Sequence, residues 1–499
     1  LNLKLFYLVI LKKEIKFYMI QEYEKLNINS FDFILSATSD FCISGDLEST
    51  LSWINKIKLN VDVKIKKVDL TPLEKWIFDD KESVIRHSSG GFYSIEGIRI
   101  ESNLKPINNW EQPIINQNEI GYLGFLVKKF NGILHFLVQA KIEPGNINIV
   151  QISPTLQATK SNCMTLHKGK SPSYLNCFIN ANNEDIIIDN LHSELGSKFL
   201  KKRNRNLIVN TLDDINILEN FKWITLKQLK QLAVMDNMLN IDARSVLATL
   251  LFSKSSNNIS YHNKLLSYEF NNKNSNFLKS FIEEDNNLID LNSIINRITK
   301  EKFFTHISLK KIKLEDMNGW VINKKLIKHE DNLYFKIIGV DSSISNREKV
   351  SWQQPMIESY GNGIYACLMK NINGKLHILT QIKAEFANRD LVELAPTLQL
   401  YSLDDKHKSK FDRDVFDLIN KSSPNNFVFD TIQSEEGGRF FHIQNRHVLL
   451  NIDNSDIESL GRFPENYLWI SLNQLTKLNR FDNILNIQLR SIISMIPIS

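Results

Sequence analysis

The chain is poor in the residues that build redox and metal sites. Its 499 residues include four cysteines, Cys42, Cys163, Cys177 and Cys367, with no C-x-x-C pair and no metal-ligand spacing. We therefore expect free, buried thiols in a reducing compartment and no bound metal. The sequence also lacks a P-loop, a dinucleotide-binding G-x-G-x-x-G, an H-E-x-x-H and a G-x-S-x-G. These absences argue against a P-loop NTPase, a dinucleotide-binding enzyme, a zinc metalloprotease of the H-E-x-x-H type and a serine α/β-hydrolase.

Strong charge of one sign and long apolar runs are missing too. The formal net charge is +5, from lysines spread along the chain, so we expect no nucleic-acid partner and at most an anionic small ligand. The longest early apolar run, residues 5–11, is far too short to span a bilayer and has no small-residue cleavage site. We expect no membrane association, a cytoplasmic location, and an upstream extension at residues 1–18.

What the chain does have is an internal repeat. Trp110 aligns with Trp352, and without a gap residues 110–157 share 21 of 48 positions with residues 352–399. The match continues with "HSELGSKFLKKRNRN" against "QSEEGGRFFHIQNRH", and with residues 223–247 against residues 469–493. Units this large indicate a duplicated domain rather than a solenoid.

The repeat sets the predicted domain organisation. We expect an N-terminal extension at residues 1–45, a first repeat at 46–250, an Asn- and Ser-rich linker at 251–286, and a second repeat at 287–499. Within each repeat, alternating segments such as residues 92–102 predict strands, and Asn131-Gly132 predicts a tight hairpin turn. Capping-box patterns at Thr225 and Ser471 predict helix starts. The fold class is therefore α+β, with a mixed or antiparallel sheet and helices in each copy.

Two strands of the first repeat carry a polar face. Because side chains alternate along a strand, residues 135–143 place His135, Gln139, Lys141 and Glu143 together, and residues 150–159 do the same for Thr155 and Gln157. A solvated sheet face is the simpler explanation, but the second repeat keeps the same residue types. Pro154 and Pro396 lie mid-strand, which predicts an edge strand or a bulge. We favour a lined cleft.

A basic segment enters a later strand. "KKRNRN" (201–206) carries four cations in six residues, which is usually a solvated charge run. As alternate residues of one strand, Lys201, Arg203 and Arg205 would instead point together at a diphosphate.

At this point the sequence resembles a known family. "WEQPIINQNEIGYLGFLVKKFNGILHFLVQAKIEPGNINIVQISPTLQAT", "HSELGSKFLKKRNRN" and "SEEGGRFFHIQNR" are similar to NDP-hexose 2,3-dehydratases, from about residue 46 onward in both copies. The resemblance implies repeats with a fold like that of Nudix hydrolases, a homodimer, and removal of water across C2 and C3 of a nucleotide-linked (usually dTDP) 4-keto-6-deoxyhexose. A sugar 3-ketoreductase would take the 3,4-diketo-2,6-dideoxy product onward. The chain lacks the Nudix R-E-x-x-E-E core, so we expect no catalytic metal and no other cofactor.

The residues fit such chemistry. The C4 ketone acidifies the C3 proton for a general base, and an acid then assists loss of the C2 hydroxyl. We expect acid and base among Lys141, Glu143, His167 and Tyr174. We expect substrate contacts from His87, Gln139, Thr155, Gln157, Ser161, Asn162, Lys201, Arg203 and Arg205.

The second repeat offers a parallel set of residues. A second nucleotide-sugar site is expected at Trp352, Lys383, Glu385, Thr397, Gln399, Arg439 and Arg446. We favour the first repeat as catalytic, because Gly145 permits a positive φ or a close ligand approach that Ala387 does not. A non-catalytic nucleotide-sugar binding protein and a structural scaffold are the alternatives.

Overall fold

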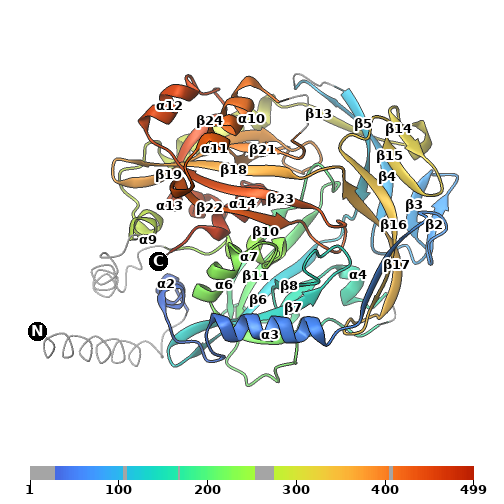
Figure 1. Cartoon of the computed structure of the whole chain (residues 1–499), viewed down its shortest axis with the longest axis horizontal. Coiled ribbons are helices and arrows are strands. Elements are labelled where there is room, and N and C mark those ends of the chain that lie inside the picture. The colour runs from blue at the N-terminus through green and yellow to red at the C-terminus, as the bar shows by residue number, and fades with distance from the viewer. Residues whose placement is uncertain (1–27, 105–108, 167–168, 253–274, 404–407, 499) are drawn as a thin grey trace, which may run out of the picture.

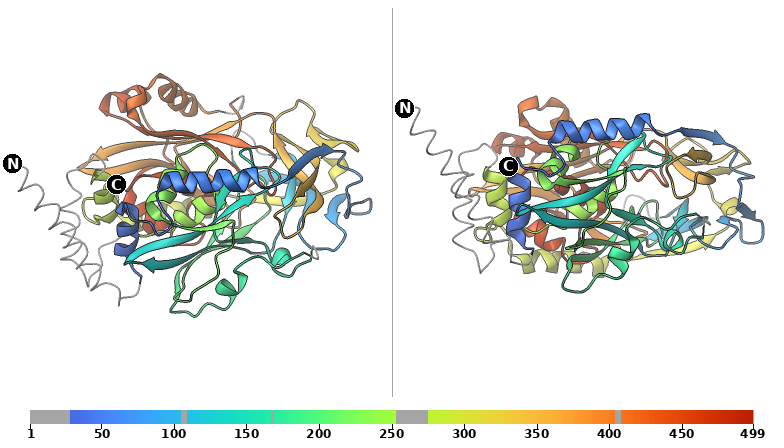
Figure 2. Two further views of the ribbon diagram at one scale, coloured as in Figure 1. Left: turned by 60° about the horizontal axis from the view of Figure 1, so that its bottom comes forward. Right: turned by 90° about the horizontal axis from the view of Figure 1, so that it is seen from below.

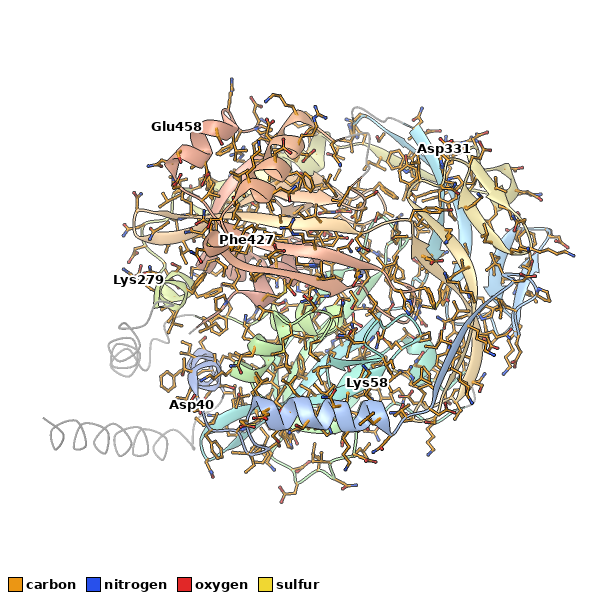
Figure 3. All side chains as sticks on the ribbon, in the orientation of Figure 1. Asp40, Lys58, Lys279, Asp331, Phe427 and Glu458 are labelled. Carbon is orange, nitrogen blue, oxygen red and sulfur yellow. The ribbon has the colours of Figure 1, made fainter. Side chains whose placement is uncertain are left out.

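The computed structural model describes residues 28–104, 109–166, 169–252, 275–403 and 408–498. The proposed extension at residues 1–18 lies outside them. The chain forms two large and two small sheets with helices between and around them, which confirms the α+β class (Figure 1). Charged side chains such as Lys58, Asp331 and Glu458 lie on the surface of this body (Figure 3). Within the described residues, no helix is both long and apolar enough to cross a membrane.

Each repeat contributes one seven-stranded mixed sheet. The first consists of β6 Gly121–Phe130, β7 Ile133–Ile142, β8 Val150–Ser153, β9 Leu156–Ala158, β10 Ile186–Ser193, β11 Arg203–Asn210 and β12 Phe221–Thr225. The second consists of β18 Gly363–Ile372, β19 Lys375–Ala384, β20 Val392–Pro396, β21 Leu398–Leu400, β22 Phe427–Ser434, β23 Gln444–Asn451 and β24 Tyr467–Ser471. Both have one parallel pair, β11 with β6 and β23 with β18. The Asn131-Gly132 turn between β6 and β7 has positive φ at both residues, as predicted.

The strand expected at residues 150–159 is two strands, because the sheet is forked. β6 and β7 pair from Phe130 back to Leu126 and then separate; β8 pairs with β7 and β9 with β6. At the fork, the Thr155 hydroxyl accepts from the N–H of Leu126 (2.9 Å) and donates to the carbonyl of Leu137. Pro154 stands at the break, so the predicted irregularity is confirmed. Thr397 fills the same place in the second repeat.

The two five-stranded sheets exchange strands between repeats. One contains β2 Trp76–Asp79, β3 Val84–His87, β4 Ser94–Ser102, β5 Asn109–Asn116 and, from the second repeat, β13 Ile307–Ile312. The other contains β14 Trp320–Ile322, β15 Leu326–His329, β16 Phe335–Ile344, β17 Ser351–Ser359 and, from the first repeat, β1 Val63–Val68. β13 pairs with β4, and β1 with β16. This reciprocal exchange interlocks the repeats, which the sequence alignment did not reveal.

Helices join the two large sheets into one core (Figure 2). The first repeat has α3 Leu47–Leu59, α4 Lys160–Cys163, α5 Leu175–Ile179, α6 Leu226–Ala233 and α7 Ile241–Leu247; the second has α10 Leu291–Phe304, η1 Leu314–Asp316, α11 Lys410–Lys421, η2 Pro424–Asn426, α12 Asn454–Leu460, α13 Leu472–Leu478 and α14 Ile487–Met495. Apolar residues of α6, α7, α13 and α14 pack together with residues of both large sheets. Burial of this shared surface holds the repeats together.

The predicted helix starts are confirmed, with one difference. Ser471 and Gln474 form the full capping box of α13. Thr225 caps α6, but the Gln228 side chain donates to the carbonyl of Gly45 (2.8 Å) instead of returning to the cap.

Two segments outside the expected repeats are also packed. α2 Ser30–Thr38 is buried in the core beside α6 and β7, and α9 Ser275–Ile282 lies within the expected linker, with the carbonyl of Phe281 accepting from Asn473 (2.8 Å). All four cysteines are free, as expected, but only Cys367 is fully buried. The other three lie on loops or short helices near the surface.

Candidate active site

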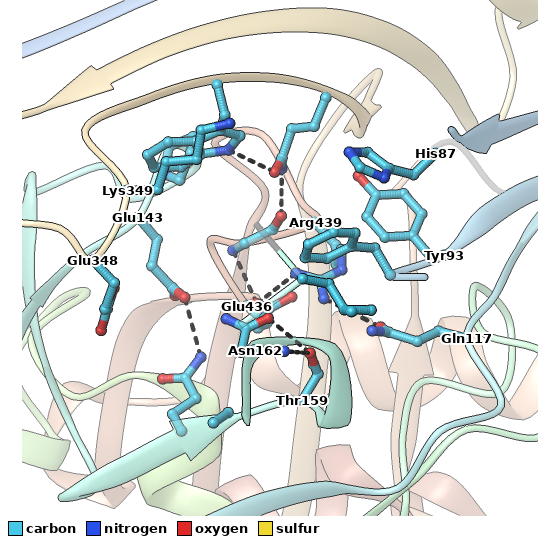
Figure 4. A pocket seen from close by; sticks show the side chains of 18 of the residues that line it. His87, Tyr93, Gln117, Glu143, Thr159, Asn162, Glu348, Lys349, Glu436 and Arg439 are labelled. Carbon is cyan, nitrogen blue, oxygen red and sulfur yellow. Dashed lines mark hydrogen bonds and ion pairs between the residues drawn. The ribbon is translucent and has the colours of Figure 1, made fainter. Parts of the chain in front are cut away.

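A cavity of about 420 Å³ opens between the first repeat's large sheet and the loops of the small sheets (Figure 4). Both repeats line it. Its deep part, called the floor here, carries the charged side chains Lys141, Glu143, Glu194, Lys202, Asp242, Glu436 and Arg439. Its outer part, called the mouth, carries Lys75, His87, Asn162, Arg347, Glu348, Lys349 and Trp352. Five of the floor residues are buried, and Glu436 and Arg439 are half-buried; the mouth residues are half-buried or, at Lys75, exposed.

The fork of the sheet aims Lys141 and Glu143 at the floor. The Lys141 ammonium donates to the carbonyl of Gln157 (3.1 Å), and the Gln157 amide donates to Glu143 (3.2 Å). Asn240, the cap of α7, donates to the same Gln157 side chain (2.9 Å). Burial is the main cause that lowers the pKa of Lys141, and Glu143 opposes it. The floor therefore favours a neutral amine more than water does.

The loop between β10 and β11 supplies a second acid and a second base, Glu194 and Lys202. The Asn204 amide donates to Glu194, and the Lys202 ammonium donates to the carbonyl of Glu119 (2.7 Å). Burial lowers the pKa of Lys202 to about 8, partly offset by Glu194. Burial also raises the pKa of Glu194, against the pull of Arg490 and Lys202. These groups are held away from bulk water, where their charges act strongly on a ligand.

The second repeat reaches into the floor through the loop between β22 and β23. The Arg439 guanidinium donates to Gln117 (3.2 Å) and lies 3.7 Å from the Glu436 carboxylate. The N–H of Gly438 donates to that carboxylate (3.0 Å). Burial raises the pKa of Glu436 to about 7, despite Arg439. A proton-transfer group near neutrality thus comes from the repeat opposite to Lys141.

The turn after β7 fixes this loop in place. Gly145 donates to the carbonyl of Gly437 (2.8 Å) and accepts from the N–H of His442 (3.1 Å). A Cβ at Gly145 would lie 1.7 Å from the carbonyl oxygen of Phe440. The close approach expected of Gly145 is therefore real, but the other repeat, not a ligand, makes it, and φ is not positive. Ala387 makes the matching contact with Gly196.

The mouth carries three cations, Lys75, Arg347 and Lys349, beside two carboxylates, Glu74 and Glu348. Lys75 of the first repeat and Lys349 of the second lie close together, and burial and the charge of Lys75 both lower the pKa of Lys349. The Arg347 guanidinium lies 5.9 Å over the ring of Trp352. An anionic group with an attached flat ring fits such an arrangement, because it would relieve the repulsion between the lysines.

Several residues singled out from the sequence meet at the cavity. His87, Lys141, Glu143, Gln157, Asn162, Trp352 and Arg439 line it. Ser161 lies just behind the wall, where its hydroxyl accepts from the N–H of Phe92 (2.8 Å) and donates to Glu119 (2.8 Å). Gln139 is half-buried and lies outside the lining. Thr155 is also outside it, since its hydroxyl is used at the fork.

The basic strand presents its other face to the site. Lys201 is exposed, and Arg203 and Arg205 are half-buried on the outside, where Arg205 pairs with Asp189 (2.5 Å). Lys202 and Asn204 point inward instead. The alternation along the strand was therefore predicted correctly, but the wrong face was chosen. The residues that face the cavity are Lys202 and Asn204, which alternate with the expected ones.

Of the two remaining acid and base candidates, Tyr174 lies away from the cavity. The Tyr174 hydroxyl donates to the carbonyl of Asn216 (2.7 Å) on the far side of the sheet. His167 lies outside the described residues. Within the described residues, no three His, Cys, Asp or Glu side chains converge as metal ligands.

In the second repeat, the corresponding hydrogen-bond network is kept, and the Tyr401 hydroxyl joins it. Gln399 donates to Glu385 (3.0 Å) and accepts from Asn486 (2.8 Å), as Gln157 does in the first repeat. Tyr401, opposite Thr159 in the alignment, receives a hydrogen bond from Gln399 (2.8 Å). Lys383 belongs to this network, Thr397 lies at the fork, and Arg446 pairs with Asp430 on the surface. A second nucleotide-sugar site here stays a prediction.

Five contributors were missed from the sequence: Glu194, Lys202, Asp242, Glu436 and Tyr93. Glu194 and Glu436 lie within quoted repeat motifs, so the motif itself was the available signal. Asp242 also lies in a repeated segment, residues 223–247, but its place in the cavity left no local signal, because its neighbours in space come from three distant segments.

Comparison with known proteins identifies the family of the chain. The family model described as NDP-hexose 2,3-dehydratase matches residues 47–250 and again residues 291–496. Three relatives are each named dTDP-4-dehydro-6-deoxy-alpha-D-glucopyranose 2,3-dehydratase. One from Amycolatopsis orientalis is 34% identical over 93% of this chain and 92% of its own length. Others, from Saccharopolyspora spinosa (35%; 86% and 86%) and Streptomyces violaceoruber (36%; 87% and 93%), are similar. The chain, matched twice by one family model and along most of its length by these relatives, belongs to the NDP-hexose 2,3-dehydratase family.

Proposed function

We propose that the cavity between the repeats dehydrates a dTDP-linked 4-keto-6-deoxyglucose across C2 and C3. The observation that carries the proposal is the distribution of charge in the cavity, with an excess of cations at the mouth and neighbouring acids and bases on the floor. The diphosphate would lie between Lys75 and Lys349, and the sugar ring on the floor. The relatives' names supply the identity of the sugar and the nucleotide.

The first step is loss of the C3 proton. The C4 ketone makes this proton acidic, and Lys141 is the proposed base because burial lowers its pKa. Glu143 tunes that pKa by its charge. The C4 oxygen gains negative charge in the resulting enolate, and Lys202 or Arg439 would stabilise it. Expulsion of the C2 hydroxyl then gives an enol that tautomerises to the 3,4-diketo-2,6-dideoxy sugar.

The test is direct. The protein is incubated with dTDP-4-keto-6-deoxyglucose, with and without a coupled sugar ketoreductase, and products are identified by mass spectrometry. We expect loss of one water with the diphosphate intact. Recovery of unchanged substrate, despite binding, would support a nucleotide-sugar binding protein instead.

Lys141→Met and Glu143→Gln should each slow turnover at least ~10²-fold, as expected for removal of acid–base catalysis. Unaltered turnover in either variant would remove that residue from the mechanism.

Several finer assignments belong to the same proposal. We infer that each repeat, at residues 46–250 and 287–499, resembles a Nudix hydrolase, with residues 251–286 between them; the sequence resemblance to the family supports this. A homodimer, a cytoplasmic location and a downstream 3-ketoreductase follow from the sequence resemblance and the expected chemistry. The 3,4-diketo product is reactive, so an enzyme that reduces it promptly is the class of partner required.

A further inference from the structure

Among the residues that the structure describes, one carboxyl group on the floor lacks a hydrogen-bond partner. Asp242, the second residue of α7, is 3% exposed and lines the cavity. Within the described part of the chain, its side chain makes no hydrogen bond and no ion pair. The other three floor carboxyl groups each accept a hydrogen bond, from Gln157, Asn204 and the N–H of Gly438. Asp242 therefore faces the cavity with its hydrogen-bonding capacity unused.

The charges on the floor favour a neutral carboxyl group. Four carboxyl groups, Glu143, Glu194, Asp242 and Glu436, share the floor with three cations, Lys141, Lys202 and Arg439. Closely spaced carboxylates cannot all be ionised in a buried site. Hydrogen-bond donors stabilise an ionised carboxylate, so the group without donors is the one that keeps its proton. In agreement, burial, and then Glu194 and Glu436, raise the pKa of Asp242 well above its ordinary value.

The second repeat shows that the fold does not need an acid at this position. The alignment places Gln488 of α14 opposite Asp242. The Gln488 amide donates to the Tyr401 hydroxyl (3.3 Å), which also accepts from Gln399 of the second repeat's network. The caps of the two helices, Asn240 and Asn486, keep the same contacts in both repeats. The acid is thus specific to the repeat that has an open floor.

We propose that Asp242 is the general acid that protonates the departing C2 hydroxyl. This inference rests on the proposed function. In the step, the C3 carbanion electron pair forms the C2=C3 bond while the C2–O bond breaks, and the oxygen leaves as water with the Asp242 proton. Balance is restored when the product tautomerises: C2 takes the proton held by the base, and the C3 hydroxyl gives one to Asp242.

The test separates the two proton transfers. Wild type, Asp242→Asn and Asp242→Gln are incubated with dTDP-4-keto-6-deoxyglucose in D₂O, and NMR follows deuterium at C3 and formation of product. We expect both variants to dehydrate at least ~10²-fold more slowly while still exchanging the C3 proton at a rate within a few-fold of wild type. Removal of the C3 proton needs the base, not Asp242. Dehydration at the wild-type rate, or loss of exchange together with dehydration, would overturn the inference.

Controls separate an effect on catalysis from an effect on folding or binding. Thermal unfolding and dTDP binding are measured on each sample, and Asp242→Gln copies a side chain that the same helix position accepts in the second repeat. Gln488→Asn, the matched change in that repeat, should leave both rates unchanged. If Glu436→Gln alone gave exchange without dehydration, Glu436 would be the acid and the inference would fail. A wild type that neither exchanges nor dehydrates would instead refute the proposed function.

Discussion

Arg439 of the second repeat lies over the ring of Tyr93 of the first, with 4.9 Å between the guanidinium carbon and the ring centroid. The contact carries a second-repeat cation into a floor otherwise built largely by the first repeat. Neither repeat alone therefore contains the whole cavity.

Replacing this cation should disable the site. Arg439→Met removes a buried positive charge that balances Glu436, and we expect a fall of roughly 10²–10³-fold in kcat/KM in a dehydration assay. Arg439→Lys should recover only part of it, because the hydrogen bond to Gln117 depends on the planar guanidinium. Arg446→Met, which breaks a surface ion pair with Asp430, is the control and should stay near wild type. Full activity of Arg439→Met would contradict the composite site.

The contact at Gly145 makes a second prediction. A Cβ there would overlap the carbonyl of Phe440, so Gly145→Ala must displace the loop that carries Glu436 and Arg439. We expect a loss of about 1–3 kcal/mol in the free energy of unfolding together with a lower kcat. Ala387→Gly at the matched turn should cost at most ~1 kcal/mol and leave kcat unchanged. A Gly145→Ala protein as active and stable as wild type would rule out the tight junction.

The two fork threonines should matter for stability and not for catalysis. Thr155→Val and Thr397→Val each leave an N–H and a carbonyl unpaired inside a sheet. We expect each to lower the free energy of unfolding by about 1–3 kcal/mol in urea, with kcat of the remaining folded enzyme unchanged. If Thr155→Val instead lowered kcat without changing stability, the result would support the substrate contact that the sequence predicted for Thr155.

Buried histidines predict the response of stability to acid. His135 accepts from the N–H of Ile43 (3.0 Å) and also bonds the carbonyl of Ile133 (2.8 Å), and burial lowers its pKa to about 4. Burial lowers the pKa of His447 to about 3. Unfolded histidines bind protons near pH ~6.5, so the folded state loses stability as pH falls from about 6.5 towards 4.

The expected slope is up to ~1.4 kcal/mol per pH unit for each histidine. Urea unfolding at several pH values measures it, and His135→Gln should reduce the slope in this window and not above it. A free energy of unfolding that stays constant down to about pH 5 would argue against buried neutral histidines.

The sequence revealed the duplicated α+β organisation because alternation and turn chemistry are local signals. The turn at Asn131-Gly132, the break at Pro154 and the convergence of Lys141 with Glu143 all followed from them. The exchange of β1 and β13 between repeats could not, because strand pairing between distant segments leaves no local pattern. For the same reason Glu436 and Asp242 were missed: their place in the site depends on how two loops and a helix meet in space.

The prediction that Lys201, Arg203 and Arg205 face the ligand was wrong for a different reason. Alternation in residues 201–206 was read correctly, but which alternate set faces inward depends on the register of β11 against β6, where Asn204 lies beside Gly121. Register is fixed by the sheet as a whole, and a shift of one residue inverts the faces.

The central claim is that this one cavity, built by both repeats, holds the nucleotide sugar. A crystal structure of the protein with saturating dTDP tests it most directly. We predict a nucleotide in the cavity, with its diphosphate between Lys75 and Lys349 and the floor at Lys141 and Asp242 free for the sugar. An empty cavity with dTDP bound elsewhere on the chain would contradict the account.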